Sequence, residues 1–291
     1  MSKFEDRLQS PQILRLDGAT GTELTRRGFA LASPAWSAAA IVDASELLLE
    51  IHRGYVAAGA EIVTANTFRT HARNLRSAGW EFQAADLTHH AVQLARQAAG
   101  SDRFVAGSIA PLEDCYSPEL TPELRSLERE HLLHAENLAA AGVDLILIET
   151  QVTIREAVAA TRAALCTKLP VLTSFTLKHT PSSQVSPQLL SGESLQDAMD
   201  AVTQLGVRGV LLNCIPASEV LPAFASLRIP PEVVTGAYAN TGRMLADGSW
   251  TQTDAQNPAV YAEYANAWKA VGIRLIGGCC GTTPQHISLL P

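Results

Sequence analysis

Two adjacent cysteines, Cys279 and Cys280, follow an apolar run near the end of the chain, in the stretch RLIGGCCGTTPQHI at residues 274–287. Neighbouring residues of a strand point to opposite faces, so a regular strand would not direct both thiols at one target. The glycines around the pair allow the chain to bend and to approach another group closely. A further cysteine, Cys214, lies near the end of another apolar run, GVLLNCI at residues 209–215. Three converging thiolates are typical zinc ligands, and an open fourth position is typical of catalytic zinc.

The cysteine count favours a metal site over disulfide bonds. The 291 residues include five cysteines, and an odd number fits a reducing compartment, where a cluster is more often metal-binding or catalytic. The alternative is that all of them are small buried side chains without a function, which suits a lone cysteine better than a trio. We expect this inert role for Cys115 and Cys166, which have no partner nearby in the sequence.

The elements that would position these thiols are short apolar, β-branched runs that alternate with alanine-rich segments. Near-continuous hydrophobicity is typical of strands buried on both faces, and the intervening segments are long enough for crossover helices. Eight such units predict a closed (β/α)8 TIM barrel that forms a single domain over residues 1–291, with an irregular loop at 178–191. The expected strands are residues 13–19, 61–67, 104–110, 145–150, 171–177, 209–215, 233–240 and 274–280.

Helix-start signals between the runs support this alternation. Asp43 with Glu46 and Thr153 with Glu156 have the spacing of capping boxes, in which the two side chains bond each other's backbone N–H groups. Thr121, which precedes a proline, predicts another helix start.

The active site of such a barrel is built at the carboxyl ends of its strands. The expected strands end in polar side chains or thiols, which core packing alone does not explain; a glutamate at the end of LILIET, for example, has no structural reason to be there. The sequence therefore predicts a site lined by Asp17, Asn66, Thr67, Ser108, Glu149, Phe175, Thr176, Asn213, Cys214, Tyr238, Asn240, Cys279 and Cys280.

Composition excludes several other classes. The formal net charge is -7 and the chain has no long run of Lys or Arg, so nucleic acid is not an expected partner. The first residues are charged and no stretch approaches ~20 apolar residues, so we expect neither a signal peptide nor a membrane span. We therefore expect a cytoplasmic location. We expect His131 and His134, and likewise His89 and His90, on solvated helix faces.

Several motifs together resemble the homocysteine S-methyltransferase family, from about residue 13 to residue 289. They are LDGATGTEL, SPAWS, YVAAGAEIVTANTF, GSIAP, LILIET, LLNC and RLIGGCCGTTPQHI. The GGCC element with an upstream Asn-Cys pair is highly specific, whereas DGATGT alone is a weak signal. The family includes S-methylmethionine-dependent enzymes, betaine-homocysteine methyltransferase and the first module of cobalamin-dependent methionine synthase.

The resemblance implies a zinc ion, Zn2+, held by Cys214, Cys279 and Cys280, with homocysteine bound as a thiolate at the open position. In related enzymes an asparagine at the place of Asn240, or a group near it, can occupy that position when substrate is absent.

The same resemblance implies how the rest of homocysteine is held. Asp17 and Glu149 would bind its ammonium group, and backbone N–H groups around Gly18 and Ala19 would bind its carboxylate. Ser108, at the end of its strand, is a further expected substrate contact.

The expected reaction is methyl transfer from a small donor to homocysteine, giving methionine, with a sulfonium such as S-methylmethionine or S-adenosylmethionine as the preferred donor. The segment LEDCYSPELTP after GSIAP is short and residues 178–191 are long, so the donor side of the pocket is expected to differ from that of relatives. Two alternatives stay open: a methyltransferase with another donor, including a separate corrinoid protein, or another thiol acceptor; and a zinc-thiolate protein that senses redox state or metal without turnover. One or two of the aromatic residues Trp36, Phe68, Tyr238 and Trp250 are candidates to face a sulfonium.

Overall fold

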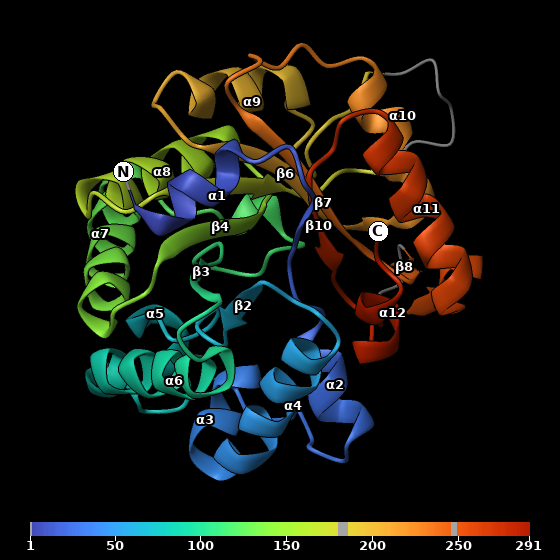
Figure 1. The fold of residues 1–291 in the computed structure, drawn as a ribbon. Coiled ribbons are helices and arrows are strands. Elements are labelled where there is room, and N and C mark those ends of the chain that lie inside the picture. Colours follow the sequence, from blue (N-terminus) through green and yellow to red (C-terminus); the bar gives the residue numbers. More distant parts are fainter. Residues whose placement is uncertain (1, 180–185, 246–248) are drawn as a thin grey trace.

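Parallel strands form a closed barrel in the computed structural model, which describes residues 2–179, 186–245 and 249–291 (Figure 1). In these residues an eight-stranded sheet runs in the order β1-β10-β7-β6-β5-β4-β3-β2. Its ends meet because Leu16 pairs in parallel with Ile62, and the Asp17 N–H donates to the Ile62 carbonyl at 3.1 Å. The predicted (β/α)8 barrel is therefore confirmed. The strands are β1 (Leu14–Arg15), β2 (Ile62–Ala65), β3 (Phe104–Ile109), β4 (Leu145–Gln151), β5 (Val171–Phe175), β6 (Gly209–Pro216), β7 (Val234–Asn240) and β10 (Leu275–Gly278).

Helices surround the barrel (Figure 1). Apolar residues at helical spacing face the sheet, as Val92, Ala95 and Ala99 of one helix do, which share a buried cluster with Val63 and Val105 of the strands. The helices are α1 (Lys3–Gln9), α2 (Thr20–Arg26), α3 (Ala39–Asp43), α4 (Ser45–Ala57), α5 (Ala72–Arg76), α6 (Ala84–Ala99), α7 (Leu124–Ala141), α8 (Ile154–Cys166), α9 (Leu195–Thr203), α10 (Val220–Ala225), α11 (Pro258–Ala270) and α12 (Pro284–Ser288).

All eight expected strands are present, and the differences lie in shorter elements. An antiparallel hairpin, β8 (Gly242–Met244) with β9 (Trp250–Gln252), was not expected, because each strand is too short to give a periodic signal. Of the loop expected at residues 178–191, residues 180–185 lie outside the described residues, and Leu189 pairs with Leu177 as an isolated bridge.

Two of the helix-start predictions were wrong and one was half right. Asp43 is the last residue of α3, and α4 begins at Ser45 without a side-chain cap. Likewise α7 begins at Leu124, after Glu123, and not after Thr121. Thr153 does cap α8 by accepting from the Glu156 N–H at 3.3 Å, but the Glu156 carboxylate turns to the Leu112 N–H at 2.7 Å and not back to Thr153.

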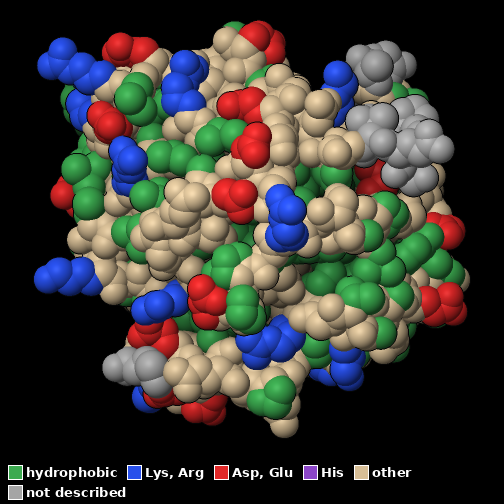
Figure 2. All heavy atoms as spheres, turned by 90° about the horizontal axis from the view of Figure 1, so that it is seen from above, with side chains coloured by type: hydrophobic (Ala, Val, Ile, Leu, Met, Phe, Trp, Pro, Cys, Tyr) green, Lys and Arg blue, Asp and Glu red, His purple; other side chains and the backbone are tan. Residues whose placement is uncertain are grey.

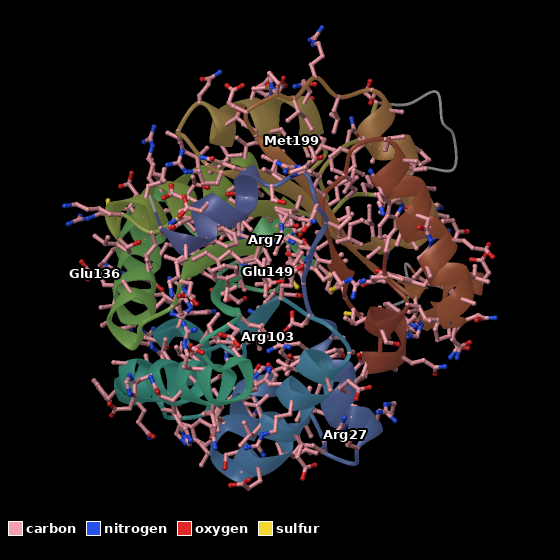
Figure 3. All side chains as sticks on the ribbon, viewed as in Figure 1. Arg7, Arg27, Arg103, Glu136, Glu149 and Met199 are labelled. Atoms are coloured by element: carbon pink, nitrogen blue, oxygen red, sulfur yellow. The ribbon has the colours of Figure 1, made fainter. Side chains whose placement is uncertain are left out.

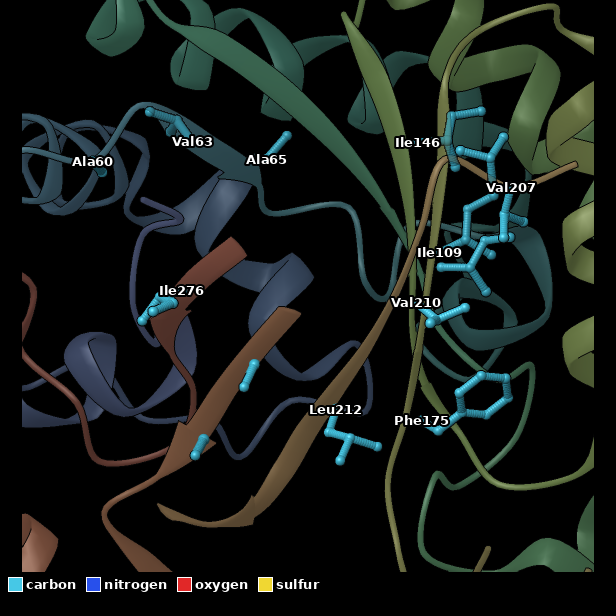
Figure 4. Close-up of a cluster of buried hydrophobic side chains, with 14 of the residues drawn as sticks. Ala60, Val63, Ala65, Ile109, Ile146, Phe175, Val207, Val210, Leu212 and Ile276 are labelled. Carbon is cyan, nitrogen blue, oxygen red and sulfur yellow. The ribbon is translucent and has the colours of Figure 1, made fainter. Parts of the chain in front are cut away.

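The core has an inner and an outer layer. The inner layer fills the barrel, and Phe4 and Leu8 of α1 close it at the amino ends of the strands, where Phe4 meets Phe104 edge to face at 5.2 Å. The outer layer lies between strands and helices; Ile146, Val207 and their neighbours belong to it (Figure 4).

Buried histidines are part of the packing around α7, which corrects one expectation. His131 and His134 are buried, not solvated, because α7 packs against both α6 and α8. His131 Nε2 lies 3.1 Å from Glu156 Oε1, and His134 Nε2 lies 3.3 Å from the Ser108 carbonyl oxygen. His89 and His90 are exposed, as expected.

The surface shows no feature of the excluded classes in the described part of the chain. On the face seen in Figure 2, basic and acidic side chains are interspersed, with no large area of one sign. None of the described helices combines the length and the apolar character that crossing a bilayer requires.

Gly236 provides a test of the packing inside the barrel. A Cβ built on Gly236 would lie 2.6 Å from Leu211 Cδ2 and 2.7 Å from Leu275 Cβ, so Gly236→Ala should lower the free energy of unfolding by about 1–3 kcal/mol. Gly54, on α4, has ordinary contacts at its Cβ position, the nearest at 3.4 Å. Gly54→Ala should therefore be neutral or stabilising by up to about 1 kcal/mol. Urea unfolding measures both, and equal midpoints for the two variants would contradict this packing.

Candidate metal and substrate site

The three predicted cysteines lie together at the carboxyl ends of two strands. Cys214 is in β6, and Cys279 and Cys280 directly follow β10. The Sγ atoms of Cys214 and Cys279 are 3.1 Å apart, those of Cys279 and Cys280 are 4.0 Å apart, and all three lie within 4.8 Å of one another. None of these cysteines is in a disulfide. The cluster is partly buried and forms a single set of sulfur ligands.

A sharp turn brings the adjacent cysteines to one point. The Cys279 N–H still donates to the Ala239 carbonyl at 2.8 Å, as the last bond of the ladder with β7, and the Thr282 N–H then donates back to the Cys279 carbonyl at 3.0 Å. Gly281 adopts φ of 85°, in the left-handed region that favours glycine. The chain therefore leaves the strand at Cys279, and the alternation of faces no longer applies to Cys280.

The donor set fits a tetrahedral metal ion. Ideal tetrahedral geometry with Zn–S bonds of about 2.3 Å places sulfur atoms roughly 3.8 Å apart. The two measured separations, 3.1 Å and 4.0 Å, lie on either side of that value, so small side-chain rotations suffice. Hydrogen bonding with Cys279 raises the pKa of the Cys214 thiol, while bonds from Cys214 and Cys279 lower the pKa of Cys280. Full ionisation of the three thiols requires a cation at this point.

A buried asparagine, Asn213, connects the cysteine cluster to the neighbouring part of the site. Its Oδ1 accepts from the Thr150 N–H at 3.0 Å and from the Ser174 hydroxyl at 2.7 Å, and its Nδ2 donates to Thr150 Oγ1 at 2.8 Å. Thr150 and Cys214 have φ of 58° and 55°, a region that β-branched residues in particular avoid. The register of β4 and of β6 shifts at these two residues. Asn213 thus holds two strained strand ends in place.

Two carboxylates, the buried Asp17 and the half-buried Glu149, lie in the same cavity as the thiols. Asp17 accepts from the Thr64 N–H at 2.7 Å and from the Thr64 hydroxyl at 2.8 Å. Glu149 accepts a very short hydrogen bond from the Ser108 hydroxyl and another from the Tyr238 hydroxyl at 3.3 Å. These bonds fix the orientation of both carboxylates. Glu149 lies toward the middle of the barrel in Figure 3, whereas Glu136 of α7 points outward.

Burial makes both carboxylates hard to ionise in the free protein. Desolvation raises the pKa of Asp17 to about 7 and that of Glu149 to about 7, partly offset by the hydrogen bonds that they accept. The charge of Glu149 raises the pKa of Asp17 further, which shows that the two groups sense each other. Neither has a lysine or arginine partner among the residues that the structure describes. A small cation in the cavity would therefore favour the ionised form of both.

The cavity has a volume of about 160 Å3 and contains all but one of the residues predicted to bind metal or substrate. Of the other predicted strand-end residues, Asn66 and Tyr238 line it, whereas Thr67, Phe175, Thr176 and Asn213 do not. It is lined by Asp17, Gly18, Ala19, Ser108, Glu149, Cys214, Cys279 and Cys280, together with aromatic side chains of Trp36, Phe68 and Tyr238. Asn240 is the exception, since it lines a separate cavity of about 110 Å3 that shares Cys214 with the first. The amide oxygen of Asn240 is buried and has no hydrogen-bond partner in the described residues. Trp250 is exposed in β9.

The backbone at Gly18 and Ala19 forms one wall of this cavity. A Cβ on Gly18 would lie 2.6 Å from the Tyr55 ring, so only glycine fits there. The Tyr55 hydroxyl donates to the Ala19 carbonyl at 2.9 Å, and the Ala19 N–H donates to Thr282 Oγ1 at 3.2 Å. Helix α2 starts directly after Ala19 without a side-chain cap, and its first residues, Thr20 and Gly21, line the cavity.

The sequence analysis did not predict several residues that hold or line the site. Thr64, which holds Asp17, was hidden inside the run EIVTANT, and only its polarity at an otherwise apolar position could have marked it. Thr150 was counted with its strand, but its contact with Asn213 joins segments 63 residues apart and has no sequence signal. Tyr116 lines the cavity of Asn240 and lies in the short segment after β3.

The Asn213 bridge predicts an effect on metal retention. Asn213→Ala leaves the Thr150 N–H and the Ser174 hydroxyl unpaired, so the free energy of unfolding should fall by about 2–4 kcal/mol. A metal ion loaded on the cysteines should be lost to a chelator on the order of 10–100 times faster, as expected for a residue that orients a ligand. Ser174→Ala removes one of these bonds only and should cost about 0.5–1.5 kcal/mol with little change in metal release. Unchanged metal release from Asn213→Ala would contradict the bridging role.

Comparisons with known proteins agree with this site. The profile of the family described as Homocysteine S-methyltransferase matches residues 14–290. The homocysteine S-methyltransferase of Escherichia coli K12 is 33% identical over 304 residues, which cover 97% of this chain and 96% of that protein. Homocysteine S-methyltransferase 1 of Zea mays is 28% identical over 305 residues, with 94% and 91% covered.

Solved structures give the same result. The metallated form of the homocysteine methyltransferase MmuM from Escherichia coli superposes with a TM-score of 0.82 at 30% identity, covering 99% of this chain and 98% of that chain. The apo form of the same enzyme superposes with a TM-score of 0.73 at 29% identity, covering 97% and 96%. The family match spans nearly the whole barrel, and the relatives are covered along nearly their whole length. This chain therefore belongs to the homocysteine S-methyltransferase family.

Proposed function

We propose that this protein transfers a methyl group from a small sulfonium donor, such as S-methylmethionine or S-adenosylmethionine, to the thiol of homocysteine, giving methionine, and that its metal is zinc. The observation that carries the proposal is a single cavity lined by three cysteine thiols and by two carboxylates that have no cationic partner among the described residues. A closed metal sensor would not require these carboxylates. A substrate with both a thiol and an ammonium group would bind the cysteine-held metal with the first and the carboxylates with the second.

The proposed metal ligands are Cys214, Cys279 and Cys280. Thiolate ligands favour zinc over magnesium or calcium, which prefer oxygen ligands. Three protein ligands leave the fourth coordination position for substrate. Bound zinc would supply the chemistry of lowering the pKa of the homocysteine thiol, so that the nucleophilic thiolate is present at neutral pH.

The carboxylates are proposed to hold the ammonium group of homocysteine. Asp17 and Glu149 are aligned by Thr64, Ser108 and Tyr238, so both carboxyl groups are oriented before substrate arrives. An ammonium between them satisfies both and stabilises their ionised forms. Ser108 acts through Glu149, to which its hydroxyl is already bonded.

The substrate carboxylate is proposed to bind the backbone around Gly18 and Ala19. The close approach that Gly18 allows and the uncapped start of α2 support this position. Asn240 is proposed to face the homocysteine sulfur from the other side of Cys214, because its buried amide oxygen has no other partner in the described residues.

The methyl transfer is a simple exchange of bonds. The homocysteine thiolate donates its electron pair to the methyl carbon, the bond from that carbon to the donor sulfur breaks, and the electron pair stays on the donor sulfur. The sulfonium leaves as a neutral thioether. The residues position the reactants and exclude water, and no side chain of the protein has to give up or accept a proton in this step.

A direct test measures methionine formation from homocysteine and S-methylmethionine by the zinc-loaded protein. Cys214→Ser, Cys279→Ser and Cys280→Ser should each lose most of the zinc by metal analysis and most of the activity. Cys166→Ser changes an exposed cysteine and should retain both. Tightly held stoichiometric zinc in all three cluster variants would refute the ligand assignment. Zinc binding without methionine formation from any sulfonium donor would favour another donor, such as a corrinoid protein, or a sensor.

Glu149→Gln tests the amino-group site. Losing one charge-assisted hydrogen bond should weaken homocysteine binding by about 1.5–3 kcal/mol at pH 8 without loss of zinc. The affinity of the parent should fall as pH drops below about 7, because Asp17 and Glu149 then take up protons. Glu149→Gln lacks one of these titrations, so its affinity should change less steeply between pH 8 and pH 6. Calorimetry measures the affinities, and Glu136→Gln, on the exposed side of α7, is the control. Parent-like affinity and pH dependence in Glu149→Gln would contradict the assignment.

A further inference from the structure

A second and larger cavity opens beside the substrate cavity at the carboxyl ends of the strands. Its volume is about 540 Å3, and Trp36 lines both cavities. Arg69, which follows β2, and Tyr116, which follows β3, line it as well. Tyr116 also lines the cavity that contains Cys214 and Asn240. The larger cavity thus shares a lining residue with each of the two cavities that contain cysteines of the cluster, and neither Asp17 nor Glu149 lines it.

Arg69 holds its charge in a fixed position with one edge unused. Its guanidinium carbon lies 5.0 Å from the centre of the Phe68 ring, and Nη1 donates to the Glu113 carbonyl at 3.0 Å and to the Pro111 carbonyl at 3.5 Å. No bond from Nε or Nη2 and no ion pair of Arg69 occurs within the described ranges. The Nε and Nη2 edge is the fork that binds a carboxylate with two parallel hydrogen bonds.

Arg69 is also the uncompensated cation of this cavity. Arg73 lies on the same wall but pairs with Glu113 at 2.8 Å and Glu130 at 2.7 Å, so these charges offset one another. Asp114 is exposed at the rim, where it accepts from the Tyr116 N–H at 3.1 Å. An anion that enters the cavity therefore meets Arg69 without a competing carboxylate within ion-pair distance.

Two aromatic side chains connect the larger cavity with the cavities that contain the cysteines: Trp36 is shared with one and Tyr116 with the other. Cys115 is buried and also lines the larger cavity. Trp36 contacts Phe68 with ring centres 5.8 Å apart. Aromatic faces attract sulfonium groups as they attract other cations.

We propose that this cavity binds the methyl donor and that Arg69 forms a bidentate ion pair with a carboxylate of that donor. The donor class is then a sulfonium that carries a carboxylate, such as a sulfonium amino acid, with its sulfonium between the aromatic side chains and the thiolate of homocysteine. The inference rests on the proposed function, since it assigns the second substrate of that reaction. Arg69 acts here as a determinant of donor specificity, because it touches the part of the donor that does not react.

The test compares two donors that share a sulfonium but differ in the carboxylate. S-methylmethionine has the carboxylate, and trimethylsulfonium lacks it. In Arg69→Met, kcat/KM for S-methylmethionine should fall on the order of 10–100-fold, mainly through KM, while kcat/KM for trimethylsulfonium should stay within about twofold of the parent. Arg69→Lys should recover only part of the loss, because an ammonium keeps the charge without the fork. Arg53→Met, at an exposed position on α4, is the matched control.

Zinc content and homocysteine affinity of the Arg69 variants should equal those of the parent. An equal loss with both donors would show that Arg69 only shapes the cavity, and an unchanged KM for S-methylmethionine would show that the carboxylate binds elsewhere; either result overturns the inference. Direct calorimetric binding of S-methylmethionine to the parent and to Arg69→Met separates this inference from the reaction itself. If the parent forms no methionine but binds S-methylmethionine through Arg69, the proposed function fails while the binding site remains.

Discussion

The hydrogen bonds between Asn213 and Thr150 hold together the two halves of the site. β4 brings Glu149, the carboxylate proposed for the ammonium group, and β6 brings Cys214 of the sulfur cluster. Both strands leave regular geometry next to these residues, with positive φ at Thr150 and Cys214. Such strained residues persist only where surrounding contacts overdetermine them, and the buried amide of Asn213 supplies those contacts in one group. The separation between Glu149 and Cys214 is thereby built into the barrel.

The second organising feature is negative charge in a small, poorly hydrated space. Three thiols and two carboxylates cannot all be ionised there without cations, and the raised pKa values of Asp17 and Glu149 express this cost. Their folded pKa values of about 7 lie above the ordinary values of 3.8 and 4.5, so the folded protein binds more protons between about pH 4 and pH 7. Stability without ligands therefore declines as pH rises through that window. A metal ion and an ammonium group reverse the penalty.

The buried histidines have the opposite effect on the pH dependence of stability. The pKa values of His52 and His134 are lowered to about 4 by burial, so the unfolded chain takes up protons first as pH falls below about 6.5. Their contribution to stability is present above that pH and is lost toward about pH 4.

The larger cavity, which is proposed for the methyl donor, has the opposite charge: Arg69 lines it, and the other ionic groups of this cavity are paired or lie at its rim. The site is thus acidic where an amine is expected and basic where a carboxylate is expected.

The sequence by itself determined most of the architecture and the three members of the cysteine cluster. Eight apolar runs separated by helical segments specify a (β/α)8 barrel. Strands that are buried on both faces must be apolar along their length, so their alternation with crossover helices is visible in the sequence. Since every barrel strand ends at one rim, the positions of Asp17, Ser108, Glu149, Cys214, Cys279 and Cys280 followed from strand ends alone.

Only the tertiary structure decided how these residues are held and which neighbours complete the site. The capping box predicted at Asp43 is absent because tertiary packing decides where a helix ends, and the spacing of two residues carries no information on that packing. The histidines of α7 are buried because two neighbouring helices cover them. The bridge from Asn213 to Thr150, the cavity that Asn240 lines with Cys214, and the contacts that fix Arg69 join segments tens of residues apart. Contacts of that kind have no periodicity in the sequence, because they depend on which loops meet above the barrel once it has closed.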